Sequence, residues 1–260
     1  MQAHRPRKRF GQHFLRDRQV IARIVAAIDP RPGQAMVEIG PGEGVLTGPL
    51  LAACGRLDVV ELDRDLAASL AERLGNPPGL VIHQADALRF DFSALAESGP
   101  LRVIGNLPYN ISTPLLFHLF AQAEAISDMV FMLQKEVVDR LVAEPGNSAY
   151  GRLSVMAGHY CEREWLFDVP PQAFLPPPKV DSAIIRLRPR TITDAERALL
   201  PRLEHLVRTA FGQRRKTLKR SLKGLLDPPA FDVTGIDPGA RPETLSLAQF
   251  RSLAEQIPAG

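Results

Sequence analysis

The sequence has few of the residues that mark disulfide-rich and metal-binding proteins. Among 260 residues there are two cysteines, Cys54 and Cys161, which lie far apart and have no nearby ligand partner. Neither a disulfide framework nor a zinc knuckle is expected, and a reducing cytoplasm fits best. The six histidines are scattered without a metal-ligand spacing. We therefore expect no bound metal.

Long apolar runs are also missing. The apolar stretches, such as Val20–Ile28 and Pro49–Cys54, are short and interrupted, whereas a membrane-spanning helix needs roughly 18 consecutive apolar residues. The first sixteen residues are basic and lack the apolar stretch of a secretory signal. A mitochondrial presequence is the alternative for this arm, but motif-bearing sequence already begins near Arg7. We expect a soluble, cytoplasmic protein without a membrane partner.

Charge is distributed unevenly along the chain, whose net charge is +3. Residues 1–16 contribute +5, residues 208–223 contribute +7, and neither window contains an acid, so the rest of the chain carries a net −9. Concentrated positive charge favours a polyanion as partner, because each neutralised phosphate releases counterions. A solvated helix face and a frayed terminus would also explain the clusters. The two clusters together predict contact with nucleic acid.

Strand-like and helix-like segments alternate along the first part of the chain. Strands are expected at 35–39, 57–62, 80–83, 102–105 and 129–133, with helices at 19–28, 66–74, 113–121 and 136–142 and a helical stretch that ends near residue 53. This alternation predicts an α/β fold with a parallel sheet covered on both faces. Two later strands, at 164–169 and 182–187, predict an antiparallel edge that completes the sheet.

The pattern becomes helical from Thr193 onward. Five apolar positions form one stripe if Gly212 does not break the helix: Val207, Phe211, Leu218, Leu222 and Leu225. We place the domain boundary near residue 190. This predicts a catalytic domain with a basic N-terminal arm over 1–190, and a helical, basic domain that binds nucleic acid over 191–260.

A glycine-rich turn follows the first strand of the predicted sheet, in the segment Met36–Gly44 (Met-Val-Glu-Ile-Gly-Pro-Gly-Glu-Gly). Glycine lets the backbone bend sharply and approach a ligand closely, as nucleotide-containing cofactors require. Nicotinamide enzymes use a similar loop. A dehydrogenase is disfavoured, because Val45 occupies the place of the third glycine of that fingerprint and no proton-relay residue is apparent.

Two acids follow the next strands. Glu61 ends the second strand, 21 residues after Gly40, where an acid would meet the ribose hydroxyls of a cofactor that lies across the sheet. Asp86 follows the third strand and would accept a hydrogen bond from an adenine amine. Ordinary surface acids at strand ends are the alternative for each. Together with the glycine turn, the two acids predict a cofactor that contains adenosine.

The segment Ile104–Tyr109 lies at the C-terminal end of the fourth strand, at the edge where open parallel sheets bind ligands. An exocyclic adenine amine is a poor nucleophile, since its lone pair is delocalised into the ring. Acceptors for both of its protons, the Asn106 side-chain oxygen and a main-chain carbonyl near Leu107, would free that lone pair. Pro108 restricts the backbone, and Tyr109 offers a face on which the base stacks.

Seven segments in this order resemble the bacterial small-subunit ribosomal RNA (16S rRNA) adenine N6,N6-dimethyltransferase A family. The resemblance runs from about residue 7 to the C-terminus and includes Phe211–Ser221. The segments are Arg7–Leu15, Val37–Gly42, Val60–Asp63, Asn106–Ser112, Met132–Val138, Tyr150–Met156 and Phe174–Ala183.

The resemblance implies a Rossmann-like, seven-stranded class I S-adenosylmethionine-dependent methyltransferase core with a small helical C-terminal domain that binds rRNA. It implies transfer of two methyl groups from S-adenosylmethionine to each of two adjacent adenosines near the 3′ end of 16S rRNA, in the small ribosomal subunit or its precursor. The cofactor contacts that it implies are His13, Leu15, Gly40, Glu61, Asp86 and Asn106. The family commonly has asparagine where His13 stands, although a neutral histidine still presents one donor and one acceptor.

Phe174 matches a family position that closes on the target base opposite Tyr109, although a plain core phenylalanine would look the same in sequence. The catalytic set is therefore expected to be Asn106, Leu107, Pro108, Tyr109 and Phe174, in a monomer. Two alternatives stay open at this point. One is a ribosome assembly factor in which binding to the immature small subunit matters more than catalysis, and the other is a sister adenine methylase that acts on large-subunit rRNA.

Overall fold

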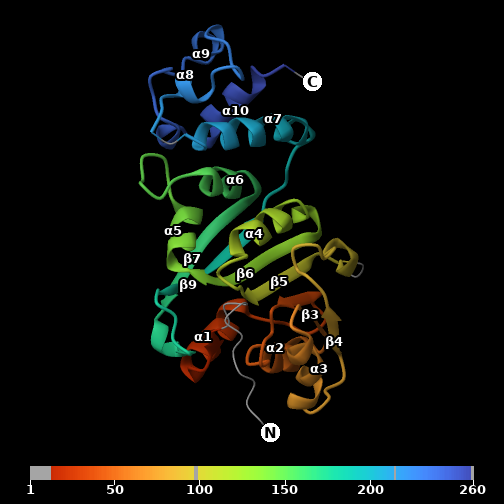
Figure 1. Cartoon of the computed structure of the whole chain (residues 1–260). Helices are drawn as coiled ribbons and strands as arrows, with labels where there is room; N and C mark the ends of the chain where they lie inside the picture. The colour runs from red at the N-terminus through yellow and green to blue at the C-terminus, as the bar shows by residue number, and fades with distance from the viewer. Residues whose placement is uncertain (1–12, 97–98, 214, 259–260) are drawn as a thin grey trace. The chain divides into compact units, whose positions relative to one another are not determined.

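The computed structural model describes residues 13–96, 99–213 and 215–258 (Figure 1). Residues 7–12 of the first motif and Arg214 of the second basic cluster lie outside this description. The chain divides into two compact units. One holds the described residues up to Val138 together with Glu164–Pro189, and the other holds Asp139–Arg163 together with the described residues from Arg190 onward.

The first unit is built on a seven-stranded sheet with the order β4-β3-β2-β5-β6-β9-β7. Neighbouring strands from β4 to β6 run parallel, and β9 runs antiparallel to β6. The predicted parallel sheet with an antiparallel strand after it is therefore confirmed. The bounds are β2 Met36–Ile39, β3 Leu57–Glu61, β4 Leu80–Gln84, β5 Leu101–Asn106, β6 Ile126–Gln134, β7 Cys161–Val169 and β9 Ser182–Pro189.

Helices connect these strands at the positions that the sequence indicates. They are α1 Arg18–Ile28, α2 Thr47–Cys54, α3 Arg64–Arg73, α4 Ser112–Phe120 and α5 Lys135–Val142, with short 3₁₀ turns η2 Ser93–Leu95, η3 Ala123–Ala125 and η4 Pro171–Ala173. Helix α1 begins after Asp17, whose carboxylate accepts hydrogen bonds from the amides of Gln19 and Val20. It ends at Asp29 in the left-handed conformation (φ 51°), directly before Pro30.

Burial explains why the central strands form. All four residues of β2 and all five of β3 are buried, as expected for parallel strands covered on both faces. Their carboxyl ends lie at one edge of the sheet, next to the ends of β4 and β5. All the segments from Gly40 to Tyr109 for which we predict a ligand contact lie at this edge of the sheet.

A second, two-stranded sheet pairs β1 (Phe14–Leu15) with β8 (Phe174–Leu175). The pairing is antiparallel, with Phe14 opposite Leu175 and Leu15 opposite Phe174. The amides of Arg16 and Asp17 extend this link by donating to the Ala173 carbonyl, at 2.8 and 3.2 Å. A segment from the start of the chain is thus fixed beside the loop that precedes β9.

The second unit contains α6 Arg152–Tyr160, α7 Asp194–Phe211, α8 Leu218–Ser221, α9 Pro229–Thr234, η5 Pro242–Thr244 and α10 Leu247–Glu255. Thr193 and Glu196 form a capping box at the start of α7. Gly212 caps its end, and α8 begins only after Thr217. The condition for a single apolar stripe from Val207 to Leu225 is therefore not met, because the helix ends at Gly212.

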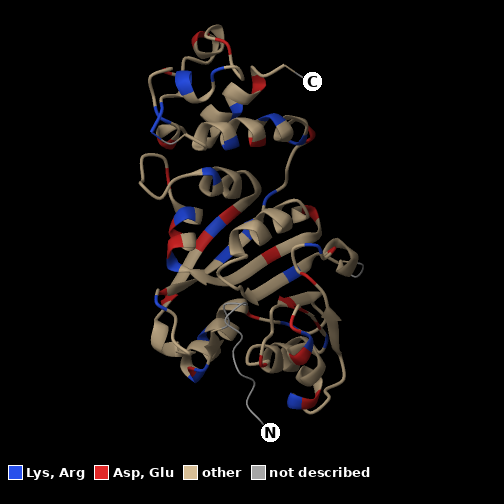
Figure 2. Cartoon of the chain, in the orientation of Figure 1, with Lys and Arg blue, Asp and Glu red and all other residues tan. Residues whose placement is uncertain are grey.

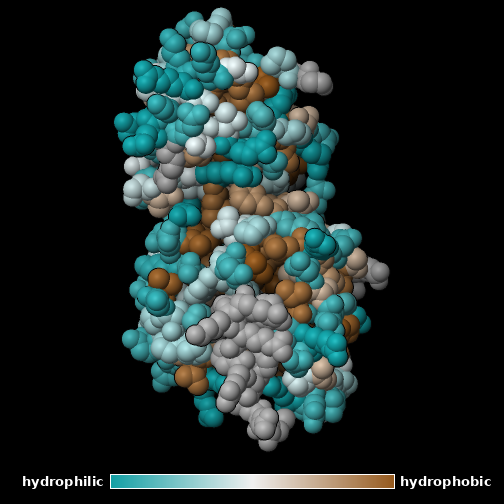
Figure 3. Space-filling view, viewed as in Figure 1, coloured by the Kyte–Doolittle hydropathy of each residue, from teal (hydrophilic) through white to brown (hydrophobic). Residues whose placement is uncertain are grey.

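Apolar packing holds α7 and α10 together within this unit. The Phe211 ring lies 5.7 Å from that of Phe250 and 6.2 Å from that of Tyr150. On the face shown in Figure 3, hydrophilic side chains predominate over these C-terminal helices. Within the described residues, no helix combines the length and the apolar character that crossing a membrane would require.

Candidate functional site

The glycine turn lies where β2 ends and the chain turns toward α2. Gly42 has φ +56°, and a Cβ atom there would stand 3.3 Å from the Phe14 ring. A side chain at this position would therefore meet both an unfavourable backbone conformation and β1. Gly105, at the end of β5, is closed by lack of space alone, since a Cβ would lie 2.8 Å from the Ile39 carbonyl oxygen. The glycine turn can approach β1, and β5 can approach the end of β2, only because these two positions lack side chains.

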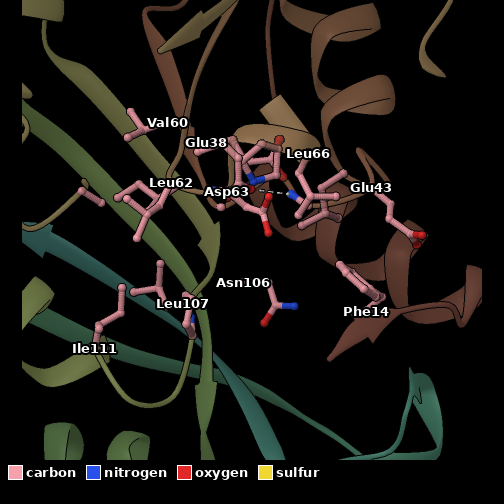
Figure 4. Close-up of a pocket in the computed structure, with 18 of the residues that line it drawn as sticks. Phe14, Glu38, Glu43, Val60, Leu62, Asp63, Leu66, Asn106, Leu107 and Ile111 are labelled. Atoms are coloured by element: carbon pink, nitrogen blue, oxygen red, sulfur yellow. Dashed lines mark hydrogen bonds between the residues drawn. The ribbon is translucent and has the colours of Figure 1, made fainter. Parts of the chain in front are cut away.

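A pocket opens at this edge of the sheet (Figure 4). Its walls come from β1, the loop after β2, the ends of β3 and β4, and the segment Asn106–Ile111 after β5. The lining includes nine of the ten predicted site residues: His13, Leu15, Gly40, Glu61, Asp86, Asn106, Leu107, Pro108 and Tyr109.

Phe174 is the predicted residue that is not part of this lining. This residue is only 4% exposed and belongs to the hydrophobic core that also contains Leu15. The next residue, Leu175, is 59% exposed. The structure thus brings together the predicted cofactor residues and the Asn106–Tyr109 segment in one pocket, whereas Phe174 is buried on β8, opposite Leu15 of β1.

The pocket lining is strongly acidic. Among the described residues that form it, none is Lys or Arg, and five are carboxylic acids: Glu38, Glu43, Glu61, Asp63 and Asp86. Such a lining favours a cationic ligand over an anionic one. S-adenosylmethionine carries a sulfonium and an ammonium group beside a single carboxylate, so the residues present fit this cofactor.

Glu38 is the most deeply buried of these acids, with 2% of its surface exposed. It accepts a hydrogen bond of 2.6 Å from the Thr47 hydroxyl. Burial raises the pKa of Glu38 to about 7, against the opposing effect of the Thr47 hydroxyl, and the nearby Glu61 adds to the rise. A cation in the pocket would favour the ionised form of this carboxyl.

Glu61 links two walls of the pocket. Its carboxylate accepts from the amide of Asp63 at 2.8 Å and from the amide of Gly42 at 3.3 Å. Burial raises the pKa of Glu61, while these two hydrogen bonds lower it. The side chain is therefore held in one position at the end of β3, next to the glycine turn. Leu62, which follows it, is 52% exposed and also lines the pocket.

Asp86 lies just beyond β4. One of its carboxylate oxygens accepts a hydrogen bond of 2.9 Å from the Leu88 amide. Because this bond uses one lone pair of one oxygen, the carboxylate still has acceptor capacity for a ligand. Glu61 and Asp86 thus provide acceptors at the ends of two adjacent strands.

The segment after β5 is fixed by the strands around it. The Leu107 amide donates to the Met132 carbonyl on β6 at 3.1 Å, and the Tyr109 hydroxyl shares a 2.7 Å hydrogen bond with the Ser182 hydroxyl at the start of β9. Burial raises the pKa of Tyr109, so its hydroxyl stays neutral near neutral pH. Figure 4 shows Asn106 within the pocket, between Leu107 and Phe14 in that view.

Glu38 and Glu43 line the pocket and Ser182 contacts Tyr109, but none of the three was predicted as a site residue. Glu38 looked like one more position of a buried strand, and only its charge inside an apolar run signals a role. Ser182 shows no signal by itself, since its partner Tyr109 lies 73 positions earlier in the chain. Glu43 is recognised only through its ion pairs with Arg16, at 2.5 Å, and Arg73, at 3.6 Å.

The sheet order, the glycine turn and the acidic pocket at the carboxyl ends of the strands define a class I S-adenosylmethionine-dependent methyltransferase. Residues 3–258 match the sequence profile of the family described as ribosomal RNA adenine dimethylase. The chain belongs to this family, and S-adenosylmethionine is its methyl donor. The resemblance and the cofactor predicted from the sequence are therefore confirmed.

Individual relatives agree with this assignment. The chain is 57% identical to the ribosomal RNA small subunit methyltransferase A of Acinetobacter baylyi, over 98% of this chain and 94% of that protein. It resembles the crystal structure of a dimethyladenosine transferase from Plasmodium falciparum, with a TM-score of 0.76, 25% identity and coverage of 93% and 96%. The 23S rRNA methyltransferase ErmE matches with a TM-score of 0.72, 32% identity and coverage of 94% and 99%.

Proposed function

We infer that this protein transfers methyl groups from S-adenosylmethionine to the N6 amines of two adjacent adenosines near the 3′ end of 16S rRNA, giving N6-dimethyladenosines during small-subunit biogenesis. The observation that carries this inference is the common pocket of the Asn106–Tyr109 segment and the acidic cofactor residues. The residues proposed to bind the cofactor and the proposed acceptors for the target amine line the same pocket. A methyl donor and an exocyclic amine can therefore meet there.

On the cofactor side, the residues have separable roles. Glu61 accepts from the ribose hydroxyls, Asp86 accepts from the adenine amine of the cofactor, and Gly40 lets the backbone approach it. Leu15 and His13 cover the cofactor from β1, and Asn106 contacts it from β5. When bound, S-adenosylmethionine supplies a methyl group activated by its sulfonium.

On the substrate side, the target adenine leaves its stack to reach the pocket. The Asn106 side-chain oxygen and a carbonyl near Leu107 accept the two amine hydrogens, Pro108 stiffens the turn, and Tyr109 provides the stacking face. Phe174 forms the opposite aromatic wall in this proposal. Since its side chain is 4% exposed, that role requires β8 to move when RNA binds.

The second unit provides the phosphate-binding surface in this proposal. In residues 208–223 the described basic side chains are all exposed: Arg208, Arg215, Lys216, Lys219, Arg220 and Lys223. Figure 2 shows Lys and Arg in blue in α8 and the loop before it. We propose that 1–190 forms the catalytic domain and 191–260 the rRNA-binding domain of a cytoplasmic monomer.

The two alternatives have less support. The large-subunit enzyme ErmE shares 32% identity with this chain, whereas the relative from Acinetobacter baylyi, named for the small subunit, shares 57%. An assembly factor in which catalysis is secondary would not require acceptors placed beside a cofactor pocket. Both roles remain compatible with the same basic surface, so catalysis has to be measured directly.

The experiment is methyl transfer from labelled S-adenosylmethionine to small subunits that lack the modification, with large subunits and DNA alongside. The RNA is then digested, and its nucleosides are identified by mass spectrometry. We expect dimethyladenosine in 16S rRNA only. Label in 23S rRNA or DNA would assign the protein to a sister methylase, and binding without label would favour the assembly factor.

A further inference from the structure

We propose that the segment 175–180, which runs from the end of β8 toward β9, is an apolar wedge that packs against the RNA bases next to the target adenosine. This proposal rests on the proposed function and extends its substrate side from the pocket to the neighbouring nucleotides. The exposure, the anchoring and the location of the segment support it.

Exposed apolar side chains gather around the pocket. Among the described residues, four large apolar side chains are exposed. Leu175 and Val180, at 59% and 45% exposure, both lie in this segment, and Leu62, at 52%, lines the pocket. The fourth, Val233, lies in the second unit. Exposed apolar side chains that cluster in one place mark a surface that another molecule covers.

Both ends of the segment are fixed to pocket residues. Near its start, His13 Nδ1 donates to the Pro176 carbonyl at 2.9 Å. Just after its end, the Ser182 hydroxyl shares a 2.7 Å hydrogen bond with the Tyr109 hydroxyl. His13 and Tyr109 line the pocket, and their rings stack with centroids 5.8 Å apart. The segment is therefore held beside the face on which the target base stacks in the proposed function.

The backbone of the segment is restricted. Residues 176–178 are three consecutive prolines, whose rings fix φ, and the Lys135 amide donates to the Asp181 carbonyl at 2.9 Å. Little conformational entropy is therefore lost when another molecule covers the exposed side chains. Because Leu175 follows Phe174 directly, any movement of β8 that brings Phe174 toward the base carries Leu175 with it.

RNA bases are the surface that this segment meets when the target adenosine stacks on Tyr109. A base that leaves its stack leaves its neighbours without a stacking partner. Proteins that deform nucleic acids insert apolar side chains such as leucine between base steps. Leu175 and Val180 provide such side chains beside the pocket. Lys179, which lies between them in sequence and is exposed, adds a cation for the RNA backbone.

The first test is kinetic. Leu175→Ser, Val180→Ser and the double variant are compared with the wild type by measuring kcat and KM for unmethylated small subunits and the Kd of S-adenosylmethionine. Because each variant loses apolar contact with RNA, we expect kcat/KM to fall about three- to tenfold per substitution. The cofactor Kd should stay within about twofold, since the pocket lining is unchanged.

Two further variants serve as controls. Leu175→Met keeps an apolar side chain of similar volume and should retain most of the activity. Val233→Ser removes an apolar side chain that is 71% exposed but lies in α9 of the second unit, and it should behave like the wild type. Full kcat/KM in the double variant, or a cofactor Kd that rises as much as kcat/KM falls, would overturn the proposal.

The second test identifies what covers the segment. The photocrosslinker p-benzoylphenylalanine replaces Leu175 or, as a control, Val233, and crosslinks to small subunits are mapped by reverse transcription and mass spectrometry. We expect crosslinks from position 175 to 16S rRNA nucleotides directly beside the target adenosines, and none there from position 233. Crosslinks from position 175 to a ribosomal protein, or to no nucleotide near the targets, would refute the wedge. If the proposed function itself fails, the wild type will form no dimethyladenosine in small subunits.

Discussion

Arg16 Nη2 lies 2.5 Å from Glu43 Oε2, and this ion pair joins the end of β1 to the glycine turn. The second carboxylate oxygen of Glu43 lies 3.6 Å from Arg73 Nη1 in the last turn of α3. Glu43 is largely buried, at 9% side-chain exposure, whereas Arg16 is about half exposed at 49%. The pair thus fastens the end of β1 to the glycine turn, and both of these segments line the pocket.

Arg16→Met should weaken cofactor binding without abolishing it. Partly exposed ion pairs contribute about 0.2–1 kcal/mol, so we expect the Kd of S-adenosylmethionine to rise about two- to fivefold, and the difference to shrink at high salt. Equilibrium binding at two salt concentrations measures this. Arg18→Met, two residues further along, is the matched control and should bind like the wild type. Equal affinity of the wild type and Arg16→Met would show that the pair does not hold the pocket closed.

Asn106→Ala should reduce turnover much more than cofactor affinity. Loss of one preorganised hydrogen-bonding group commonly lowers kcat by about 10²–10³-fold, and the other cofactor residues stay in place. Single-turnover methylation of small subunits measures the rate, and equilibrium binding measures the affinity. Asn110→Ala is the control, since Asn110 lines the same pocket but has no predicted role. Near-normal turnover in Asn106→Ala would refute its assignment as the amine acceptor.

Glu38 makes cofactor affinity depend on pH. Its folded-state pKa of about 7 lies above the ordinary value of 4.5, so in the free protein stability falls as pH rises from about 4.5 to about 7. A cationic ligand favours the ionised form, and binding therefore releases a proton. We expect affinity for S-adenosylmethionine to increase between about pH 6 and about pH 8, measured by calorimetry in two buffers.

In Glu38→Gln this increase should be smaller, with Glu61 left as the second acid whose pKa burial raises. The exposed Glu72→Gln serves as the control and should keep the full pH dependence. A variant Glu38→Gln with an unchanged pH profile would show that the carboxyl does not respond to the cofactor.

Arg102 should be important for stability rather than for catalysis. It pairs with Asp128 through two hydrogen bonds of 2.7 and 2.9 Å and also donates to the Ile28 and Asp29 carbonyls at the end of α1. Arg102→Met leaves Asp128 buried with one fewer partner, so the free energy of unfolding should fall by about 3–5 kcal/mol. Urea denaturation measures this. The double variant with Asp128→Leu should recover part of the loss, and a larger loss in the double variant would contradict the explanation.

The basic cluster should control the salt dependence of RNA binding. Replacing Arg215, Lys216, Lys219 and Arg220 by glutamine should weaken binding to small subunits and reduce the slope of log K against log salt, because fewer phosphates are neutralised. Filter binding over a salt series measures the slope. The exposed Arg64 and Arg89, replaced together, are the control. A full slope in the cluster variant would mean that this surface is structural.

Sequence periodicity predicted the sheet well where strands are long and buried. The strand expected at 57–62 is observed as Leu57–Glu61, and the one at 102–105 as Leu101–Asn106. Helix α6 was missed because seven of its nine residues are buried, so no apolar stripe marks it. Strands β1 and β8 have two residues each, which is too short for any period. Their pairing depends on contacts far apart in sequence.

For the site, the residues between Gly40 and Tyr109 were predictable because parallel strands bring their carboxyl ends to one edge. The resemblance to the family added His13 and Leu15. The role of Glu43 was not predictable, since an ion pair across the pocket leaves no mark on the local sequence. Only its charge distinguishes Glu38 from the equally buried apolar residues around it.

The pairing of β1 with β8 has a consequence for how the protein is made. His13 and Pro176, which are hydrogen bonded to each other, lie 163 positions apart in the chain. While the ribosome synthesises the chain, Phe14 and Leu15 therefore have no strand partner until Phe174 and Leu175 have emerged. The glycine turn and its neighbouring strands are complete long before that moment. A nascent chain thus forms its methyl-donor site in two stages. The wall that contains Phe14 and Leu15, which are synthesised first, is among the last parts of this site to take its final structure.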